Sequence, residues 1–323
     1  MDIVCTGSIA YDYLMTFPGY FRDHILVEKL ESISLSFLVD SMVRQRGGVA
    51  ANIAYTLALL GGHPRLVGTA GEDFGEYRAR LENEGVDTSG VRIILGKFTA
   101  SFFANTDLSN AQISSFYTGA MANASEISLE KLPGGKPGIV LISPNDPGAM
   151  VKYVNECQRE GIPYLYDPSQ QIIRMEPQDL QNGIEGAEAL FVNEYEFELL
   201  QKRTGMDAET ILSHPKFTVI TCGENGAKIV DHGEITSVPV VSPAVVADPT
   251  GVGDAFRGGF LTGYRMGWDW STCGKMGALA ATYCLEQRGT QNHHYTPTEF
   301  VTRFRQNFDD HGLLDALNKT EGR

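Results

Sequence analysis

The heptapeptide Asp248-Pro249-Thr250-Gly251-Val252-Gly253-Asp254 lies between an extended, β-rich segment, residues 238–247, and a segment with helical periodicity, residues 255–263. Gly251 and Gly253 therefore fall at a predicted helix start. There the first backbone N–H groups have no intrahelical acceptor and the helix dipole is positive. Because glycine has no side chain, an anion can approach those N–H groups closely. The stretch predicts an anion hole built from the backbone.

Asp254 falls in the first turn of the predicted helix. A carboxylate beside an anion hole suits a loop that holds a phosphoryl group during transfer, because it can take the proton of the attacking hydroxyl. A second interpretation is structural: Thr250 caps the helix, the glycines allow close packing, and Asp254 complements the dipole. This stretch alone leaves both interpretations open.

The composition is that of an ordinary globular enzyme, with 42% hydrophobic and 20% charged residues among 323. This length predicts one large domain with an appendage, or two domains. The net charge of −14 argues against nucleic acid and anionic membranes as partners. It does not exclude nucleotides, because backbone N–H groups and Mg²⁺ can neutralise phosphates locally.

The cysteines are odd in number, far apart, and form no CxxC pair, which favours reduced thiols over disulfides or a zinc site. They are Cys5, Cys157, Cys222, Cys273 and Cys284. No signal peptide, membrane span or lipidation motif is visible in the sequence. We therefore expect a cytoplasmic protein.

The N-terminal residues 3–10 form an apolar run typical of a buried central strand, and Asp12 follows just beyond it. Ligands of open α/β sheets bind outside the carboxyl ends of the strands, so Asp12 is a candidate ligand contact. An Asx turn explains Asp12 equally well.

Gly47-Gly48 opens a predicted helix that runs through Leu60. Asn52 lies near its start, in an Ala-rich environment where a polar amide must find partners. It could bond a neighbouring loop, or it could hold the hydroxyl groups of a ligand.

Strands and helices alternate in the βαβα order of a mostly parallel sheet with helices on both faces. The predicted strands are 65–71, 139–143, 163–166, 189–192, 217–221 and 227–230, and the predicted helices are 73–84, 147–160 and 194–204.

Four β-like runs, 33–37, 91–95, 101–106 and 113–117, interrupt this alternation and suggest a small antiparallel sheet outside the main one. A lid is the functional interpretation, since phosphoryl transfer must exclude water. The alternative is a dimerisation flap.

Two further motifs follow predicted strands. Asn193 and Glu196 have the spacing of a capping box, and Glu196 could also serve Mg²⁺ through water. Residues 221–226 form a glycine-bearing turn that could hold a nucleotide or be a plain β-turn. A Walker motif is absent and no G-x-G-x-x-G follows the first strand, which argues against Walker-type kinases and dinucleotide oxidoreductases.

Together, Gly47-Gly48 with Asn52, Asn193 with Glu196, and 248–256 resemble the ribokinase-like (PfkB) carbohydrate kinase family in order and spacing over nearly the whole chain. The resemblance implies an α/β fold, a three-layer αβα sandwich with a central mostly parallel sheet and a small β-sheet lid. It implies one kinase domain, residues 1–318, with lid segments at about 13–46 and 91–120. Residues 319–323 are expected to be frayed.

The resemblance also implies roles for individual residues. Asp254 would be the general base, and the N–H groups of Gly251, Val252 and Gly253 would form the anion hole. Acceptor hydroxyls would be held by Asp12, Gly48 and Asn52. The Mg²⁺ region would be served by Glu196, through water. The ATP site would be formed by Asn193, Thr221, Gly223 and Gly226, with Asn292 beside the adenine.

One departure from the family pattern is Pro249, where many members carry a second Thr. Proline has no N–H to donate to a phosphate. A loop for a monovalent cation such as K⁺ exists in some relatives near the position of Asp248, and Pro249 leaves that role open here.

The expected activity is ATP-dependent phosphorylation of a primary hydroxyl on a ribose-containing small molecule. Residues 106–121 resemble adenosine kinases, which favours adenosine as acceptor. A nucleoside base also needs apolar walls, and the lid segments supply aromatic residues: Tyr11, Tyr13, Phe17, Phe37, Phe102, Phe103, Phe116 and Tyr117. The alternatives are a ribokinase- or fructokinase-type sugar kinase and a catalytically silent nucleoside sensor. Either a monomer or a homodimer is compatible with the sequence.

Overall fold

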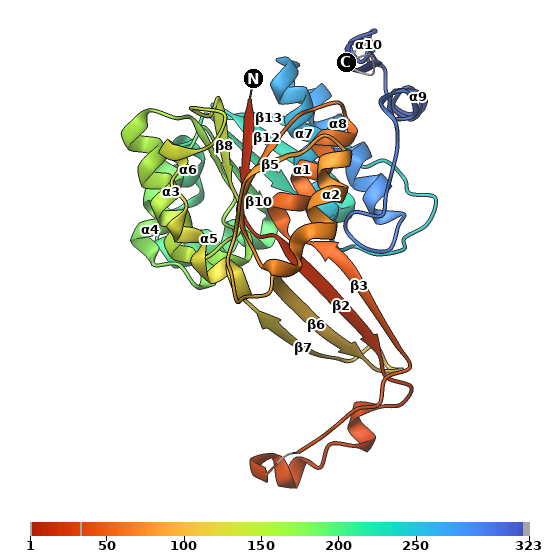
Figure 1. Ribbon diagram of the computed structural model, residues 1–323. Coiled ribbons are helices and arrows are strands. Elements are labelled where there is room, and N and C mark those ends of the chain that lie inside the picture. The colour runs from red at the N-terminus through yellow and green to blue at the C-terminus, as the bar shows by residue number, and fades with distance from the viewer. Residues whose placement is uncertain (1, 33, 319–323) are drawn as a thin grey trace.

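The computed structural model describes residues 2–32 and 34–318. Within these residues it contains a nine-stranded sheet and a four-stranded sheet (Figure 1). The large sheet has the order β13-β12-β11-β10-β9-β8-β1-β4-β5. Its strands are β1 (Ile3–Thr6), β4 (Arg65–Ala70), β5 (Asp87–Ile93), β8 (Ile139–Ile142), β9 (Tyr164–Tyr166), β10 (Ala189–Asn193), β11 (Phe217–Thr221), β12 (Ala227–Asp231) and β13 (Glu234–Val238).

The large sheet is parallel from β5 to β11, and β12 and β13 are antiparallel at its edge. The central strands are short apolar runs, as strands covered on both faces must be. In β8, for example, all four residues are buried. This arrangement confirms the predicted α/β class and the mostly parallel central sheet.

Helices cover both faces of the large sheet and bury two separate apolar clusters against it (Figure 1). On one face lie α1 (Val49–Leu59), α2 (Gly75–Asn83), α7 (Val252–Met266) and α8 (Trp270–Leu285), and α9 (Pro297–Asn307) and α10 (Asp315–Asn318) extend this cluster. On the other face lie α3 (Pro147–Glu160), α4 (Pro177–Glu185), α5 (Glu194–Thr204) and α6 (Ala208–Ser213).

Glycines in α7 bring this helix very close to its two neighbours. A Cβ at Gly258 would lie 2.5 Å from the Cβ of Thr56 in α1, and one at Gly259 would lie 2.5 Å from the carbonyl of Met276 in α8. Any side chain at these positions would force the helices apart. The glycine-rich sequence after Asp254 therefore fixes the start of α7 against the start of α1.

The four-stranded sheet is the predicted smaller sheet, which we call the lid after its proposed role, with the order β3 (Ser41–Gly47), β2 (Ala10–Thr16), β6 (Ala100–Thr106) and β7 (Gln112–Tyr117). Two expectations about it were wrong. Residues 91–95 belong mainly to β5 at the edge of the large sheet, and residues 34–37 form no strand. The sheet is also mixed rather than antiparallel, because β2 continues from β1 with no helix between and pairs in parallel with β6.

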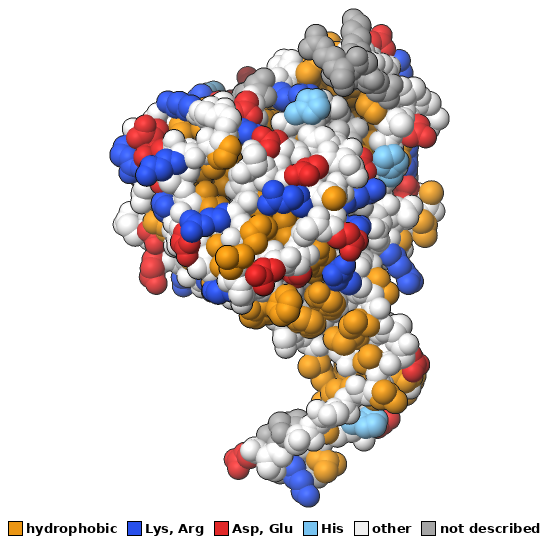
Figure 2. Space-filling model, in the orientation of Figure 1, with side chains coloured by type: hydrophobic (Ala, Val, Ile, Leu, Met, Phe, Trp, Pro, Cys, Tyr) orange, Lys and Arg blue, Asp and Glu red, His pale blue; other side chains and the backbone are white. Residues whose placement is uncertain are grey.

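Residues 17–32 and 34–40 extend beyond the lid (Figure 1). Phe17, Phe21 and Phe37 pack together there, with ring centroids 4.9–5.4 Å apart. The short helices η1 (Phe21–Asp23) and η2 (Val27–Ser32) lie in this segment. Exposed apolar side chains also gather where the lid leaves the body (Figure 2).

Other boundaries follow the local sequence. The helices predicted at 147–160 and 194–204 correspond to α3 and α5 residue for residue. The β-rich segment predicted at 238–247 forms no strand after Val238, where two prolines follow at 239 and 243.

In the part of the chain described, no helix is long and apolar enough to cross a membrane. Residues 319–323 lie outside the described residues, so their predicted fraying stays a prediction.

Candidate active site

The anion hole predicted from the glycines lies at the N-terminus of α7. Gly251 is the N-cap residue, with φ 78° and ψ 0°, a left-handed conformation that favours glycine. The first helical bond runs from Ala255 N to the Gly251 carbonyl. Val252 N reaches the Pro249 carbonyl only at 3.4 Å, so an anion could compete for this N–H. The backbone geometry therefore suits an anion hole.

Asp254 is joined to the predicted substrate residue Asn52. The Asn52 Nδ2 donates to Asp254 Oδ2 at 2.8 Å. Close packing of α1 on α7 makes this contact, and Gly48 allows the turn into α1, since a Cβ there would lie 2.5 Å from the Ser8 carbonyl. Asn52, Gly48 and Asp254 are therefore parts of one site.

A buried hydrogen-bond network fixes the Asn52 amide. Its Oδ1 accepts from Thr290 Oγ1 at 2.9 Å and from Gln291 Nε2 at 2.8 Å. Gln291 also bonds the Tyr77 hydroxyl, which donates to the Gly47 carbonyl. Because Oδ1 has two donors, Nδ2 must face Asp254. The structure thus gives Asn52 a role in holding the carboxylate, besides the predicted contact with a ligand.

Two carboxylates of the site have raised pKa values. Burial raises the pKa of Asp254 to about 6, against the opposing effects of the Asn52 hydrogen bond and the Arg257 charge. Burial also raises the pKa of Asp12 to about 6, helped by the charges of Asp248 and Asp254. A carboxyl with a pKa near 6 is a stronger base than an ordinary aspartate and is still mostly ionised at neutral pH.

An ion pair that sequence reasoning missed lies beside Asp254. Arg257 Nε lies 2.6 Å from Asp167 Oδ2, and Nη2 donates to Asp167 Oδ1 at 2.7 Å. Burial alone would lower the pKa of Arg257, but the carboxylates of Asp167 and Asp254 raise it. Both partners are buried. The guanidinium is therefore a fixed positive charge next to the base.

Asn193 and Glu196 form the predicted capping box at the start of α5. Glu196 N donates to Asn193 Oδ1 at 2.7 Å, and Asn193 N donates to Glu196 Oε2 at 2.8 Å. The other oxygen, Oε1, accepts from Ser169 Oγ at 3.0 Å. The charge of Glu196 also raises the pKa of Asp254. Glu196 thus caps α5 and also lies near enough to Asp254 for its charge to act on the base.

The fit of Mg²⁺ to this region follows from its chemistry. Mg²⁺ commonly takes one or two carboxylates together with waters and substrate phosphates. Within the described residues, no group of three or more His, Cys, Asp or Glu side chains could hold a metal ion by itself. Glu196 retains lone pairs beyond its two hydrogen bonds. The residues therefore fit a water-bridged ion that reaches the site with a nucleotide.

The residues predicted to line the ATP site form a tight loop after β11. Thr221 ends the strand, and Cys222 N donates to the Gly226 carbonyl at 2.7 Å. Gly226 has φ 85°, and a Cβ there would lie 2.0 Å from the Val238 carbonyl. A Cβ at Gly223 would instead point into open space. The loop offers exposed backbone for a nucleotide at Gly223.

Asn292 belongs to another loop, between α8 and α9. Its side chain is exposed and donates to the Arg288 carbonyl at 2.7 Å. In the same loop, Gly289 N donates to Asp248 Oδ2, which ties the loop to the glycine-rich stretch. Burial would raise the pKa of Asp248, but hydrogen bonds from the backbone N–H groups of Thr250 and Gly289 lower it below its ordinary value. The proximity of Asn292 to adenine stays a prediction.

Strand pairing places one row of side chains on the lid face that carries Asp12. Gln45, Asp12, Phe102 and Phe116 are directly paired across β3, β2, β6 and β7. Directly paired residues project from the same face. The charge of Asp254 raises the pKa of Asp12, so the two carboxylates lie near each other. This face of the lid is therefore turned toward the catalytic side of the body. A Cβ at Gly289 would also touch Gln45.

The structure divides the eight lid aromatics among different surroundings. The alternation of strands puts four of them on the opposite face, namely Tyr11, Tyr13, Phe103 and Tyr117. There Tyr13 stacks on Phe103 at 4.8 Å. Two more, Phe17 and Phe37, belong to the cluster beyond the lid. Only Phe102 and Phe116 share the face of Asp12.

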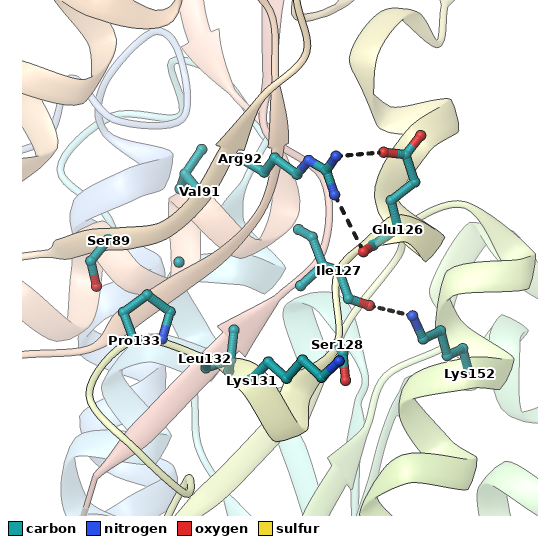
Figure 3. Close-up of a pocket in the computed structure, with 11 residues that line it drawn as sticks. Ser89, Val91, Arg92, Glu126, Ile127, Ser128, Lys131, Leu132, Pro133 and Lys152 are labelled. Carbon is teal, nitrogen blue, oxygen red and sulfur yellow. Dashed lines mark hydrogen bonds and ion pairs between the residues drawn. The ribbon is translucent and has the colours of Figure 1, made fainter.

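A cavity of about 440 Å³ lies elsewhere, beside β5 and α3 (Figure 3). It is lined by none of the predicted site residues. Two of its three cations are already engaged: Arg92 pairs with Glu126, and Lys152 donates to the Ile127 carbonyl. This cavity is therefore not connected with the chemistry of Asp254.

Sequence reasoning missed Arg257, Asp167, Thr290, Gln291 and Tyr77. A signal existed for two of them. Arg257 is a charged residue one turn after Asp254, among apolar and small neighbours in α7, and Asp167 directly follows a buried strand. Nothing local singles out the other three, because their importance comes from partners more than 200 positions away in two of the contacts.

Comparison with known proteins finds similarity over nearly the whole chain. The sequence matches the pfkB family carbohydrate kinase model over residues 6–298. The nucleoside kinase of Methanocaldococcus jannaschii is 28% identical over 306 residues, which cover 94% of this chain and 97% of that protein.

Two solved structures of the Burkholderia thailandensis nucleoside kinase are also similar. The complex with inosine has a TM-score of 0.85 at 35% identity and covers 95% of this chain and 99% of that chain. The complex with ADP-inosine has a TM-score of 0.82 at 37% identity and covers 95% of this chain and 96% of that chain.

Proposed function

Because this chain belongs to the pfkB family of carbohydrate kinases, we propose that it transfers the γ-phosphoryl group of ATP to a primary hydroxyl of a nucleoside, with adenosine as the best candidate acceptor. The observation that carries this proposal is the pairing of Asp254 with Asn52 at the N-terminus of α7. The similarity to nucleoside kinases supports a nucleoside as the acceptor class.

The base acts on the acceptor hydroxyl. Asp254 Oδ2 is held by Asn52, which leaves the other carboxylate oxygen to accept the hydroxyl proton as the oxygen attacks the γ-phosphorus. The N–H groups of Gly251, Val252 and Gly253 face the transferring phosphoryl group and stabilise its charge. The acceptor oxygen gains the phosphoryl group, ADP leaves, and Asp254 holds the proton.

The nucleotide and its metal ion would bind beside the segments that follow β10 and β11. The loop at Gly223 and Gly226 would hold ATP, and Glu196 would hold Mg²⁺ through water. When bound, Mg²⁺ would neutralise charge on the phosphates. A monovalent cation such as K⁺ near Asp248 stays a prediction, as does the oligomeric state.

The acceptor is held under the lid. Asp12 would bond ribose hydroxyls, and Phe102 and Phe116, on the same face, would pack on the flat base. A free sugar has no base to fill this apolar part of the site. The row of side chains on the lid therefore favours a nucleoside over ribose or fructose.

The test is release of ADP with ATP and Mg²⁺ in excess, measured with adenosine, inosine, cytidine, ribose and fructose. We expect kcat/KM to be highest for adenosine. A nucleoside other than adenosine in first place would retain the reaction and change the acceptor. A wide advantage of ribose or fructose would refute nucleoside specificity in favour of a sugar kinase.

A silent nucleoside sensor is the competing class. It predicts tight nucleoside binding in a calorimeter with no ADP released for any acceptor. The presence of Asp254, both glycines and Glu196 in one site speaks against it.

A further inference from the structure

The buried pair of Arg257 and Asp167 joins two elements that meet at the catalytic base. Arg257 lies in the second turn of α7, and Asp167 follows the last residue of β9. The guanidinium donates one hydrogen bond, from Nη2 to Asp167 Oδ1 at 2.7 Å, and its Nε lies 2.6 Å from Oδ2 without hydrogen-bond geometry. Their exposed fractions are 7% and 0%. Such a contact leaves the guanidinium little freedom to reorient.

Arg257 also reaches the anion hole directly. Its Nη1 donates to the Gly253 carbonyl at 3.0 Å, and a Cβ at Gly253 would lie 3.0 Å from the same nitrogen. The peptide that follows this carbonyl carries the N–H of Asp254. One side chain therefore contacts the backbone of the anion hole and is fixed by Asp167 from the other side.

The charges around Asp254 explain why this position matters. Glu196 on α5 opposes ionisation of Asp254, and burial does the same. Asp12 on β2 and Asp167 after β9 add further negative charges nearby, and the charge of Asp254 raises the pKa of each. Against these, the Asn52 amide and the Arg257 guanidinium favour the ionised base. Among these neighbours, Arg257 is the one positive charge.

A purely structural role is the alternative. Buried ion pairs are often no more stabilising than apolar residues of similar volume, because both charges lose their hydration. Such a pair is thus a weak means of stabilising a fold. Its contacts with Gly253 and its charge beside Asp254 point to the site instead.

We propose that Arg257 is a positioning residue for phosphoryl transfer, fixed by Asp167: it orients the peptide between Gly253 and Asp254, next to the anion hole, and keeps Asp254 ionised. This inference rests on the proposed function. Asp167 acts only through Arg257, and neither residue needs to touch the acceptor or ATP.

The test compares Arg257→Gln, Arg257→Lys and the control Arg265→Gln. Arg265 lies two turns farther along α7, is half-buried, and its Nε makes no hydrogen bond. For each variant, kcat and KM are measured from pH 5 to 9 with the acceptor that the wild-type protein prefers.

We expect Arg257→Gln to lower kcat at least 30-fold and to move the acid limb of the kcat profile upward by half a pH unit or more, with acceptor KM within threefold. Arg257→Lys keeps the charge and should return the acid limb toward wild type. Arg265→Gln should leave kcat and the profile unchanged. If kcat falls while the acid limb stays in place, or if the acid limb of Arg257→Lys is no closer to wild type than that of Arg257→Gln, the pair is only a structural contact.

A second variant covers the case in which Arg257→Gln fails to fold. The double change Arg257→Gln with Asp167→Asn removes both charges and still allows a hydrogen bond between the side chains. It should lower kcat as Arg257→Gln does, but the acid limb should move upward less, because removal of the Asp167 charge favours ionisation of Asp254. A kcat within threefold of wild type in this variant would overturn the proposal. Turnover by the wild-type and Arg265→Gln proteins shows separately whether the kinase assignment holds.

Discussion

The amide of Asn52 donates a 2.8 Å hydrogen bond to the carboxylate of Asp254 across 202 positions of sequence. Thr290 and Gln291 hold the other end of that amide, so its orientation is fixed before any ligand binds. Preorganised contacts of this kind cost no rearrangement during the reaction. Asp254, which matches the family's general base, is therefore held by Asn52, whose expected partners were a neighbouring loop or the hydroxyl groups of a ligand.

Changing Asp254→Asn should remove turnover and retain binding. The asparagine Oδ1 can still accept the bond from Asn52 Nδ2, but the amide cannot take a proton from the acceptor. We expect kcat to fall by about 10²–10⁴. Calorimetry should give acceptor and nucleotide affinities close to wild type. Asp309→Asn, at an exposed position far along the chain, is the matched control. Normal turnover by Asp254→Asn would show that another group is the base.

Changing Asn52→Leu should move the pH dependence of turnover. The Asn52 hydrogen bond lowers the pKa of Asp254, so its loss raises that pKa further. Because the base must be ionised, the acid limb of kcat should shift to higher pH, and the loss of activity should be larger at pH 6 than at pH 8. The control is Thr56→Val, one turn on in α1, whose buried hydroxyl has no hydrogen-bond partner. An equal loss at every pH would contradict a role in ionisation.

The raised pKa values of Asp12 and Asp254 predict a cost in stability at neutral pH. Both groups bind a proton more tightly in the folded state, about pKa 6, than at the ordinary value of 3.8. Their contribution to stability is therefore fully present below pH 3.8 and is lost as pH rises through 6. Asp12→Asn and Asp254→Asn should exceed wild type in free energy of unfolding at pH 7.5.

Urea unfolding at several pH values checks this prediction. The advantage of each variant over wild type should shrink as pH falls from 6.5 and should be gone near pH 4. Comparing differences removes the contributions of carboxylates common to both proteins. An advantage that does not vary with pH would trace to packing instead of ionisation.

Two glycines of the loop after β11 should respond differently to alanine. In Gly226→Ala the new Cβ would meet the Val238 carbonyl at 2.0 Å, so both stability and ATP binding should suffer. In Gly223→Ala the Cβ meets nothing, and only backbone strain of about 1–2 kcal/mol is expected. If the nucleotide fills that open space, Gly223→Ala should still raise the KM for ATP. An unchanged KM would place ATP elsewhere.

Adjacent phenylalanines of β6 test the lid. Phe102 shares the face of Asp12, and Phe103 projects from the other face against Tyr13. Loss of stacking on a base costs about 1–3 kcal/mol, so Phe102→Ala should raise the KM for a nucleoside roughly tenfold or more. Phe103→Ala should change it little. The opposite order would mean that the base contacts the other face of the lid.

Much of the architecture could be predicted because it depends on near neighbours in sequence. The capping box of Asn193 and Glu196 joins residues three positions apart, and α5 begins where it predicts. Gly251 adopts the left-handed conformation that opens α7. Apolar runs such as β8 became buried strands. The assignment of 91–95 to the lid was wrong because a strand's own sequence does not say which sheet it will join.

The sequence by itself determined the backbone of the site: the glycines at the start of α7, the capped start of α5 and the order of strands and helices around them. Only the tertiary structure decided which side chains complete it. Asn52 meets Asp254, Arg257 meets Asp167, and Phe102 shares a face with Asp12. The physical reason is range. Backbone conformation follows from sterics and hydrogen bonds within a few residues, whereas these contacts exist only once distant segments pack together.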